Sequence, residues 1–487
     1  MFLLLLLLAV VSYVFHEVYW KRRKLPPGPT PLGVFGNTIE IYQKAPGYEA
    51  YGGWGKKYGP VHTYWMGTQP IIGISDFALI KQHIINDGDK YTARWSMNDL
   101  MLDFVGGDYG IIGSMGELWR EQRRLTLHIM RDFGMGRNIM EDRVMVEVDF
   151  LIDRLASLKT EVSVQHEFDI AVGSVINNIL FGYRFDEQHL DEFSLVKESL
   201  RDLVKILTTP LFSVAMMTPQ IRGIPPFKGL YQKFYDTRDV LLGFIRRQIE
   251  MKKRMVKYEA EESEDFVESY LKEWEKKKGT DQEGYYFEQQ LVAVVVDIWT
   301  AGMETTSNTL TWAICYILNH QEVQEKLHEE LDRVIKSDRK VTAADKNNLP
   351  YVNAVVSEAQ RLCNLLPQNL FRVNTEDVTI GGYSIPAGSV IVPQISAVMY
   401  DERVFPEPYS FKPERFLKPD GTYKKYEELV PFSVGKRACV GEGLAKLELY
   451  LFLANIFQSY RVTARTLPSM EKGCGQIVTC KPYKLLS

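Results

Sequence analysis

The residues best suited to chemistry lie near the C-terminus, in the segment PFSVGKRACVG. They form the pattern F-x-x-G-x-R-x-C-x-G, contributed by Phe432, Gly435, Arg437, Cys439 and Gly441. The glycines let the backbone approach a flat group closely, and the arginine supplies a cation beside it. A helix is predicted directly after Cys439, and its N-terminal amides favour a thiolate. The pattern therefore predicts a thiolate loop facing a planar, anionic cofactor. A lone cysteine would more commonly be an inert buried residue.

A second set of polar residues interrupts a long apolar stretch, predicted to be a helix over roughly 287–319. Helical spacing places five residues along one face: Asp297, Ala301, Glu304, Thr305 and Asn308. Polar groups on an apolar helix need a partner or a purpose. A threonine that donates to the carbonyl four residues earlier would equally explain Thr305, so both interpretations stay open from the residues alone.

Two residue pairs have spacings that bring their side chains together on one helix face. Glu358 and Arg361 form E-x-x-R, which by itself is typical of a surface salt bridge. Trp119 and Arg123 form W-x-x-x-R, which suits either a bound carboxylate or an ordinary surface cation–π pair. Neither pair decides a function alone.

The N-terminal segment predicts a membrane anchor. Residues 1–20 are apolar as far as Phe15, and Lys21–Lys24 follow as a basic run. About twenty helical residues cross one hydrocarbon core, and charge placed after the apolar run favours an uncleaved signal anchor over a cleaved signal or a buried helix. The positive-inside rule then keeps the body on the cytoplasmic face. Residues 21–33 are a basic, proline-rich hinge.

The elements that must position these residues are mostly helices. Strand signals are confined to a hairpin at Val61–Ser75 and a cluster at Asp377–Ser396. A chain of 487 residues suggests about three domains by length, but no composition shift marks a boundary. We expect one large domain, 34–487, mainly α with a small β-rich lobe.

Composition excludes several protein classes. The 58 basic and 62 acidic residues give a net charge of −4, so a nucleic-acid partner is not expected. Five cysteines cannot form a disulfide framework. No G-x-G-x-x-G opens a helix after a strand, so electrons for any redox reaction must come from another protein.

Taken together, the motifs resemble the cytochrome P-450 superfamily, and the layout is similar to its microsomal, second-family-like members. The resemblance implies a P-450 fold with haem b between the long helix and the cysteine loop, and Cys439 as the axial iron ligand. It implies propionate contacts from Trp119, Arg123 and Arg437, joined by Arg94 and Arg372. It also implies a buried network of Glu358, Arg361 and Arg415 that braces the loop.

The resemblance also implies a reaction. Thr305 would hydrogen-bond dioxygen or its water, and Glu304 with Asp297 would relay protons. The expected activity is monooxygenation of a hydrophobic small molecule (a xenobiotic, fatty acid or steroid) with O2 as co-substrate. Pocket segments are expected within 97–115, 204–212 and 473–477. The specific pocket residues expected are Trp299, Thr300, Ala301, Leu365, Leu366 and Leu370.

Electrons are expected from NADPH through a membrane-bound cytochrome P-450 reductase, with assistance by cytochrome b5 left open. Endoplasmic reticulum membrane is the implied location. A basic docking face is expected from Arg120, Arg124, Arg131, Lys436 and Lys446. Two other classes stay open: a haem-thiolate isomerase or dehydratase that works without reductase, and a non-catalytic haem-binding sensor or carrier.

Overall fold

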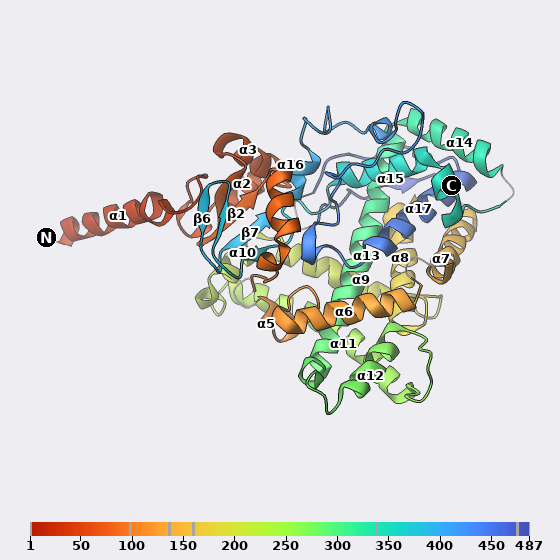
Figure 1. Cartoon of the computed structure of the whole chain (residues 1–487), viewed down its shortest axis with the longest axis horizontal. Coiled ribbons are helices and arrows are strands. Elements are labelled where there is room, and N and C mark those ends of the chain that lie inside the picture. The colour runs from red at the N-terminus through yellow and green to blue at the C-terminus, as the bar shows by residue number, and fades with distance from the viewer. Residues whose placement is uncertain are drawn as a thin grey trace.

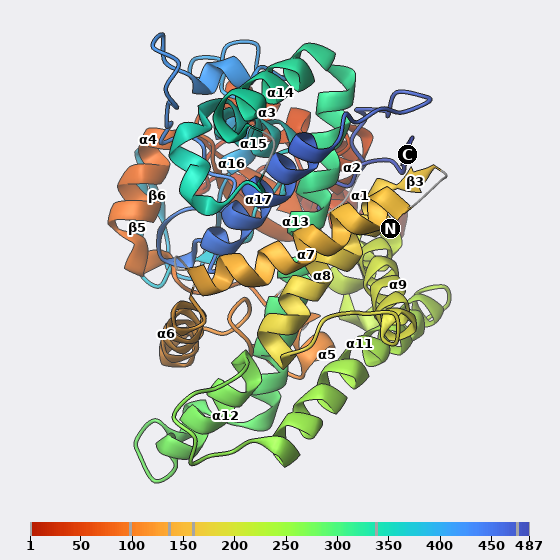
Figure 2. The same cartoon turned by 90° about the vertical axis from the view of Figure 1, so that its right-hand side faces the viewer.

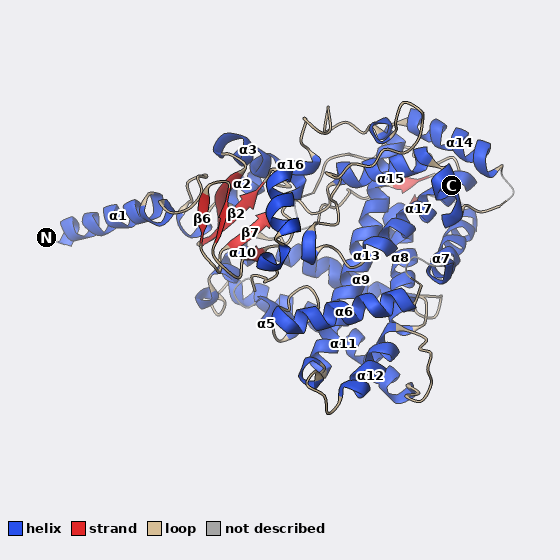
Figure 3. Cartoon of the chain, viewed as in Figure 1, coloured by secondary structure: helices blue, strands red, loops and turns tan. Residues whose placement is uncertain are grey.

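The computed structural model describes residues 2–96, 100–134, 138–157, 161–336, 339–473 and 477–486. Helices make up most of the body, and most of the strands gather at one end of it, beside the N-terminal helix, while the short pair of β3 (Val162–Ser163) and β8 (Lys484–Leu485) lies near the C-terminus (Figure 1, Figure 3). The predicted fold class, mainly α with a small β-rich lobe, is confirmed. In the first half of the chain the helices are α1 Phe2–Val18, α2 Thr38–Gln43, α3 Tyr48–Tyr58, α4 Phe77–Leu79, α5 Leu100–Val105, α6 Gly116–Asp132, α7 Asn138–Ser157, α8 Val164–Phe181, α9 Leu190–Leu207, α10 Pro210–Met217 and α11 Phe227–Met255. In the second half they are α12 Phe266–Lys277, α13 Glu288–Asn319, α14 Gln321–Ile335, α15 Pro350–Cys363, α16 Ile395–Met399 and α17 Glu442–Ser459.

Helix α13 is the axis of the body. Its 32 residues span about 48 Å at 1.5 Å per residue, and its side chains are buried almost all round. Helices α8, α11, α15 and α17 pack against it. The view in Figure 2 shows α7 beside α17, in agreement with their contacts. A helix buried on every side is held rigidly, which suits it to position reacting groups.

The β-rich lobe contains one sheet of four strands, in the order β1-β2-β7-β4. The hairpin of β1 and β2 is antiparallel, β7 runs parallel to β2, and β4 is antiparallel to β7. The remaining strands form two small two-stranded sheets. The strand bounds are β1 Val61–Met66, β2 Gln69–Ile74, β3 Val162–Ser163, β4 Arg372–Val373, β5 Val378–Ile380, β6 Tyr383–Ile385, β7 Val390–Pro393 and β8 Lys484–Leu485.

Helix α1 projects away from the body (Figure 1). The stretch Leu4–Arg22 is long and apolar enough to cross a membrane, and none of it is buried. The proline-rich segment behind it is not a free spacer, because Pro26, Gly28, Pro29 and Pro31 are buried. A Cβ on Gly28 would lie 1.7 Å from the carbonyl oxygen of Thr63, so only glycine fits against β1 there.

Candidate active site

A cavity lies between α13 and the cysteine loop. Its empty volume is about 1580 Å³, part of which is open to solvent. Helix α13 contributes Asp297, Ala301 and Thr305 to one wall, and the loop contributes Phe432 and Cys439 to another. Two segments predicted from motifs more than 120 residues apart therefore face one cavity.

The geometry of the loop presents the sulfur of Cys439. Gly435 has φ +68°, and a Cβ there would lie 2.1 Å from the carbonyl oxygen of Ile84, so the turn requires glycine. The amide of Cys439 donates to the carbonyl of Phe432 at 2.9 Å. Burial raises the pKa of the Cys439 thiol, while hydrogen bonding from the Gly441 amide opposes that rise. A bound metal ion would complete the deprotonation.

Four arginines converge beside the loop without a counter-charge. Arg94, Arg123, Arg372 and Arg437 form no ion pair within the part of the chain that the structure describes; their guanidinium groups donate only to backbone carbonyls and one serine hydroxyl. Burial, together with the neighbouring guanidinium groups, lowers the pKa of Arg94 to about 10, of Arg372 to about 9 and of Arg437 to about 8. Such a cluster is costly unless an anion joins it.

Three buried donor atoms at this cluster lack acceptors. They are Nε1 of Trp119 and Nε and Nη1 of Arg372. The Trp119 ring lies 4.0 Å from the guanidinium carbon of Arg437. A planar group carrying two carboxylates and a metal centre open to a thiolate would satisfy the donors, the cations and Cys439 together. The residues present therefore fit haem b, whose two propionates are such carboxylates.

Asp297 lines the cavity and fixes the backbone of the segment that forms one of its walls. Its Oδ2 accepts hydrogen bonds from the amides of Ile111 and Ile112, both at 2.8 Å. A Cβ on Gly110 would lie 2.2 Å from that oxygen, so glycine permits the approach. Burial is the main reason that the pKa of Asp297 is raised to about 7. The carbonyl of Ile111 in turn accepts from Arg437, so this carboxyl group supports the arginine cluster.

Thr305 lines the cavity, but Glu304 does not. The hydroxyl of Thr305 donates to the carbonyl of Ala301 at 2.7 Å. The carboxylate of Glu304 pairs instead with Lys197 of α9, at 2.6 Å. The prediction that Glu304 shares the cavity face with Asp297 and Thr305 was wrong, because Lys197 and Asn308 hold its carboxylate outside the lining.

The predicted pocket residues divide in the same way. Ala301, Leu365, Leu366 and Leu370 line the cavity. Trp299 does not: it is fully buried and packs against Phe244 with ring centroids 5.8 Å apart. Thr300 also lies outside the lining, and its hydroxyl donates to the carbonyl of Val296.

Of the expected pocket segments, 97–115 contributes Ile111 and Ile112, whereas 204–212 contributes nothing. Residues 97–99 and 474–476 lie outside the described residues. Sequence reasoning missed Met130, Ile176 and Glu448, which also line the cavity. Gly302 was a sequence signal for the close approach of Ile176. Because glycine has no Cβ, the Ile176 side chain can pack against it; a Cβ on Gly302 would lie 2.5 Å from Cδ1 of Ile176.

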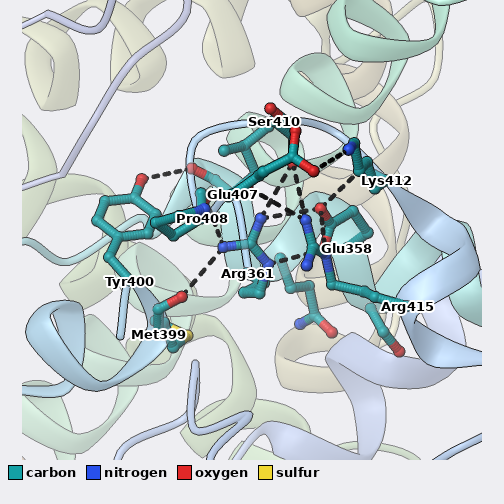
Figure 4. Close-up of polar contacts among 12 residues, drawn as sticks. Glu358, Arg361, Met399, Tyr400, Glu407, Pro408, Ser410, Lys412 and Arg415 are labelled. Carbon is teal, nitrogen blue, oxygen red and sulfur yellow. Dashed lines mark hydrogen bonds and ion pairs between the residues drawn. The ribbon is translucent and has the colours of Figure 1, made fainter. Parts of the chain in front are cut away.

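Glu358, Arg361 and Arg415 form one buried network (Figure 4). Arg361 donates to both carboxylate oxygens of Glu358, at 2.7 and 2.8 Å, and Arg415 donates to one of them at 3.1 Å. Arg361 also donates to the carbonyls of Met399 and Pro408. The network therefore ties α15 to the segment that precedes the cysteine loop.

The comparisons with known proteins agree with this arrangement. A family model described as Cytochrome P450 matches residues 26–486. Cytochrome P450 2C20 of Macaca fascicularis is 33% identical over 461 residues, covering 94% of this chain and 92% of the relative. Cytochrome P450 2C5 of Oryctolagus cuniculus is 34% identical, covering 92% and 91%. Cytochrome P450 2C8 of Homo sapiens is 34% identical, covering 91% and 89%.

Proposed function

Because this chain belongs to the cytochrome P450 family, whose members are haem-thiolate monooxygenases, we propose that Cys439 ligates the haem iron and that the cavity accepts a hydrophobic small molecule. The balanced reaction takes a substrate C–H bond, O2, NADPH and a proton to an alcohol, water and NADP+. The observation that carries the site assignment is the cluster of four arginines beside Cys439, two buried (Arg372 and Arg437) and two half-buried, which form no ion pair within the described residues.

Haem b, when bound, supplies the oxygen activation; the protein supplies ligation, orientation and protons. The Cys439 thiolate would ligate the iron and donate electron density to it, and the hydrogen bond from the Gly441 amide stabilises the negative charge of the sulfur. The propionates would be held by the indole of Trp119 and by Arg94, Arg123, Arg372 and Arg437. The Thr305 hydroxyl donates to the Ala301 carbonyl and would exchange this bond for one to a ligand in the cavity. The apolar side chains at Leu365, Leu366 and Leu370 receive the substrate.

We assign the electron supply to an NADPH-dependent flavoprotein reductase that docks near the cysteine loop, and leave cytochrome b5 as an optional second donor. The basic side chains proposed for docking are exposed, but several are already paired: Arg120 with Glu117, Lys436 with Asp89 and Lys446 with Glu442. Charge reversal at Lys436 and Lys446 should weaken reductase binding and its salt dependence. Unchanged affinity and salt dependence would remove this face from the proposal.

We also propose that α1 is a single-pass anchor in the endoplasmic reticulum membrane and that the body faces the cytoplasm. The support is its exposed apolar surface and the basic residues Lys21–Lys24 that follow it. Deleting Phe2–Val18 should release folded, haem-loaded protein into the soluble fraction. Membrane retention of the truncated chain would contradict α1 as the sole anchor.

The function is tested by reconstitution with reductase. Hydrophobic candidates are screened by their shift of the haem spin state, and products are then analysed with NADPH and O2 present. A hydroxylated product that depends on NADPH supports the proposal. A product formed from a peroxide without reductase would favour the isomerase alternative instead.

A further inference from the structure

Three tyrosine rings form a continuous chain from the cavity wall to the surface. The ring centroids of Tyr48 on α3 and of Tyr400, which follows α16, are 5.1 Å apart, and those of Tyr400 and Tyr409 are 5.0 Å apart. Such separations are typical of aromatic rings in contact. Tyr48 is buried, whereas Tyr409 is 68% exposed. The chain therefore runs from the interior of the body to solvent.

The inner end of this chain touches the wall of the cavity. The hydroxyl of Tyr48 donates to the backbone carbonyl of Cys363 at 3.0 Å, and Cys363 is part of the cavity lining. The hydroxyl of Tyr400 donates to the carbonyl of Leu362, one residue earlier, at 2.7 Å. Both phenols are therefore held at the C-terminal turn of α15, directly behind the cavity.

Lys472 places an amine against the middle ring of the chain. Its Nζ atom hydrogen-bonds to the hydroxyl of Tyr400 and to the carbonyl of Leu362. The same atom lies 4.9 Å from the ring centroid of Tyr48 and 5.1 Å from that of Tyr400. The amine is therefore within the reach that proton transfer from the Tyr400 phenol requires.

Lys472 has no carboxylate partner within the described part of the chain. The charged and titratable groups that face it are Arg361 and Cys363 of α15, Tyr48 of α3, and Tyr400. Burial lowers the pKa of Lys472 to about 7, opposed by the Cys363 thiol and assisted by Arg361. A neutral amine is therefore well populated near physiological pH, and a neutral amine can accept a proton.

We propose that Tyr400 is a redox-active tyrosine with Lys472 as its proton acceptor, and that Tyr48, Tyr400 and Tyr409 carry oxidising equivalents from the cavity wall to the protein surface. The inference rests on the proposed function, because the oxidant is a peroxide acting together with bound haem. The chain removes oxidising equivalents that no substrate in the cavity has consumed.

Each step of this transfer balances. Tyr400 loses one electron toward the cavity, through the ring of Tyr48, and loses its phenolic proton to Lys472, which leaves a neutral tyrosyl radical and an ammonium ion. Tyr409 then gives an electron to Tyr400 and a proton to solvent, while Lys472 returns its proton to Tyr400. A soluble thiol supplies the electron and the proton that restore Tyr409.

The test uses the full-length, haem-loaded protein, mixed with hydrogen peroxide without substrate or reductase. Tyrosyl radical is measured by electron paramagnetic resonance after rapid freezing, and Y400F should lower its yield severalfold. Y460F is the matched control, since Tyr460 also donates to a backbone carbonyl, at 2.8 Å, but lies at the end of α17, outside the chain of three tyrosines. A nitroso spin trap should label Tyr409 in the wild type, as located by mass spectrometry, and Y400F should lose this label.

The pH dependence of the radical yield tests Lys472. In the wild type the yield should rise severalfold as pH increases through about 7, because only the neutral amine accepts the proton. K472R keeps a cation but offers no base, so its yield should stay low across the same range. K205R should keep the wild-type profile, since Lys205 is exposed and pairs with Asp202.

An unchanged radical yield or a retained Tyr409 label in Y400F would overturn the inference, and so would a wild-type pH profile in K472R. A wild type that forms no tyrosyl radical, although its reduced carbon monoxide complex shows the thiolate-type absorption, would also overturn it. A wild type without the thiolate-type absorption would instead contradict the proposed function.

Discussion

The guanidinium carbon of Arg437 lies 4.0 Å from the centre of the Trp119 ring, although the two residues are 318 positions apart (437 − 119). This contact joins the cysteine loop to α6. The ring nitrogen of Trp119 is buried and has no acceptor, and Arg437 is part of the uncompensated arginine cluster. The two residues therefore form a binding surface for an anion.

Replacing Trp119 by phenylalanine keeps the aromatic contact and removes the indole donor. A hydrogen bond to a charged group contributes about 1.5–3 kcal/mol, so we expect haem to dissociate roughly 10- to 100-fold faster by the same estimate. Transfer of haem to a scavenging apoprotein measures this rate. W54F is the control, because Trp54 is also buried and its indole bonds Glu40 away from the site. Equal rates for W119F and wild type would exclude the indole from propionate binding.

Replacing Glu358 by glutamine should destabilise the protein strongly. The change leaves Arg361 and Arg415 buried without a counter-charge, and breaking a buried ion pair costs about 3–5 kcal/mol. Thermal unfolding and haem content report the loss. The comparison is E117Q, which breaks an exposed pair with Arg120 worth at most about 1 kcal/mol. Similar losses in both variants would show that the network does not brace the fold.

Glu448 should make stability depend on pH. It is buried on α17, and burial raises its pKa to about 8 from the ordinary value of 4.5. The unfolded chain therefore loses this proton first, and stability falls as pH rises from about 4.5 through 8, by up to about 1.4 kcal/mol per pH unit. Denaturant unfolding of E448Q across this range should give a flatter profile. A profile as steep as that of the wild type would assign the titration to another group.

Replacing Thr305 by alanine should raise the peroxide released per NADPH severalfold, because the cavity loses the hydroxyl that can hold a proton near bound oxygen. T305S should restore most of the coupling. T311A serves as control, since Thr311 makes the same hydrogen bond to the residue four positions earlier but is buried away from the cavity. Unchanged coupling in T305A would leave this hydroxyl with a structural role only.

Sequence reasoning could predict those parts of the site whose residues lie close together in the chain. Glu358 and Arg361 are three residues apart on one helix, and the cysteine loop is one segment, so local rules suffice for both. The rotation of α13 about its own axis, which decides which of its residues face the cavity, could not be predicted in this way. Its residues are buried almost all round, so hydrophobic periodicity does not distinguish the cavity face from the face that contacts α9. That is why Trp299, Thr300 and Glu304 were expected in the wrong place.

Contacts between distant segments were also beyond sequence reasoning. The partner of Glu304 is Lys197, 107 residues earlier, and no spacing rule connects them. The arginine cluster combines Arg94, Arg123, Arg372 and Arg437, whose mutual approach depends on the packing of the β-rich lobe against α6 and the loop. Only the resemblance to a family indicated that these residues would meet.

The most direct test of the account is the carbon monoxide difference spectrum of the reduced, haem-loaded protein. Wild type should show the absorption shift typical of a thiolate ligand, and C439A should lose it while C363A retains it, because Cys363 lies buried in the same cavity wall at the end of α15. A thiolate-type shift that persists in C439A would contradict the assignment of Cys439 as the iron ligand, and with it the proposed site.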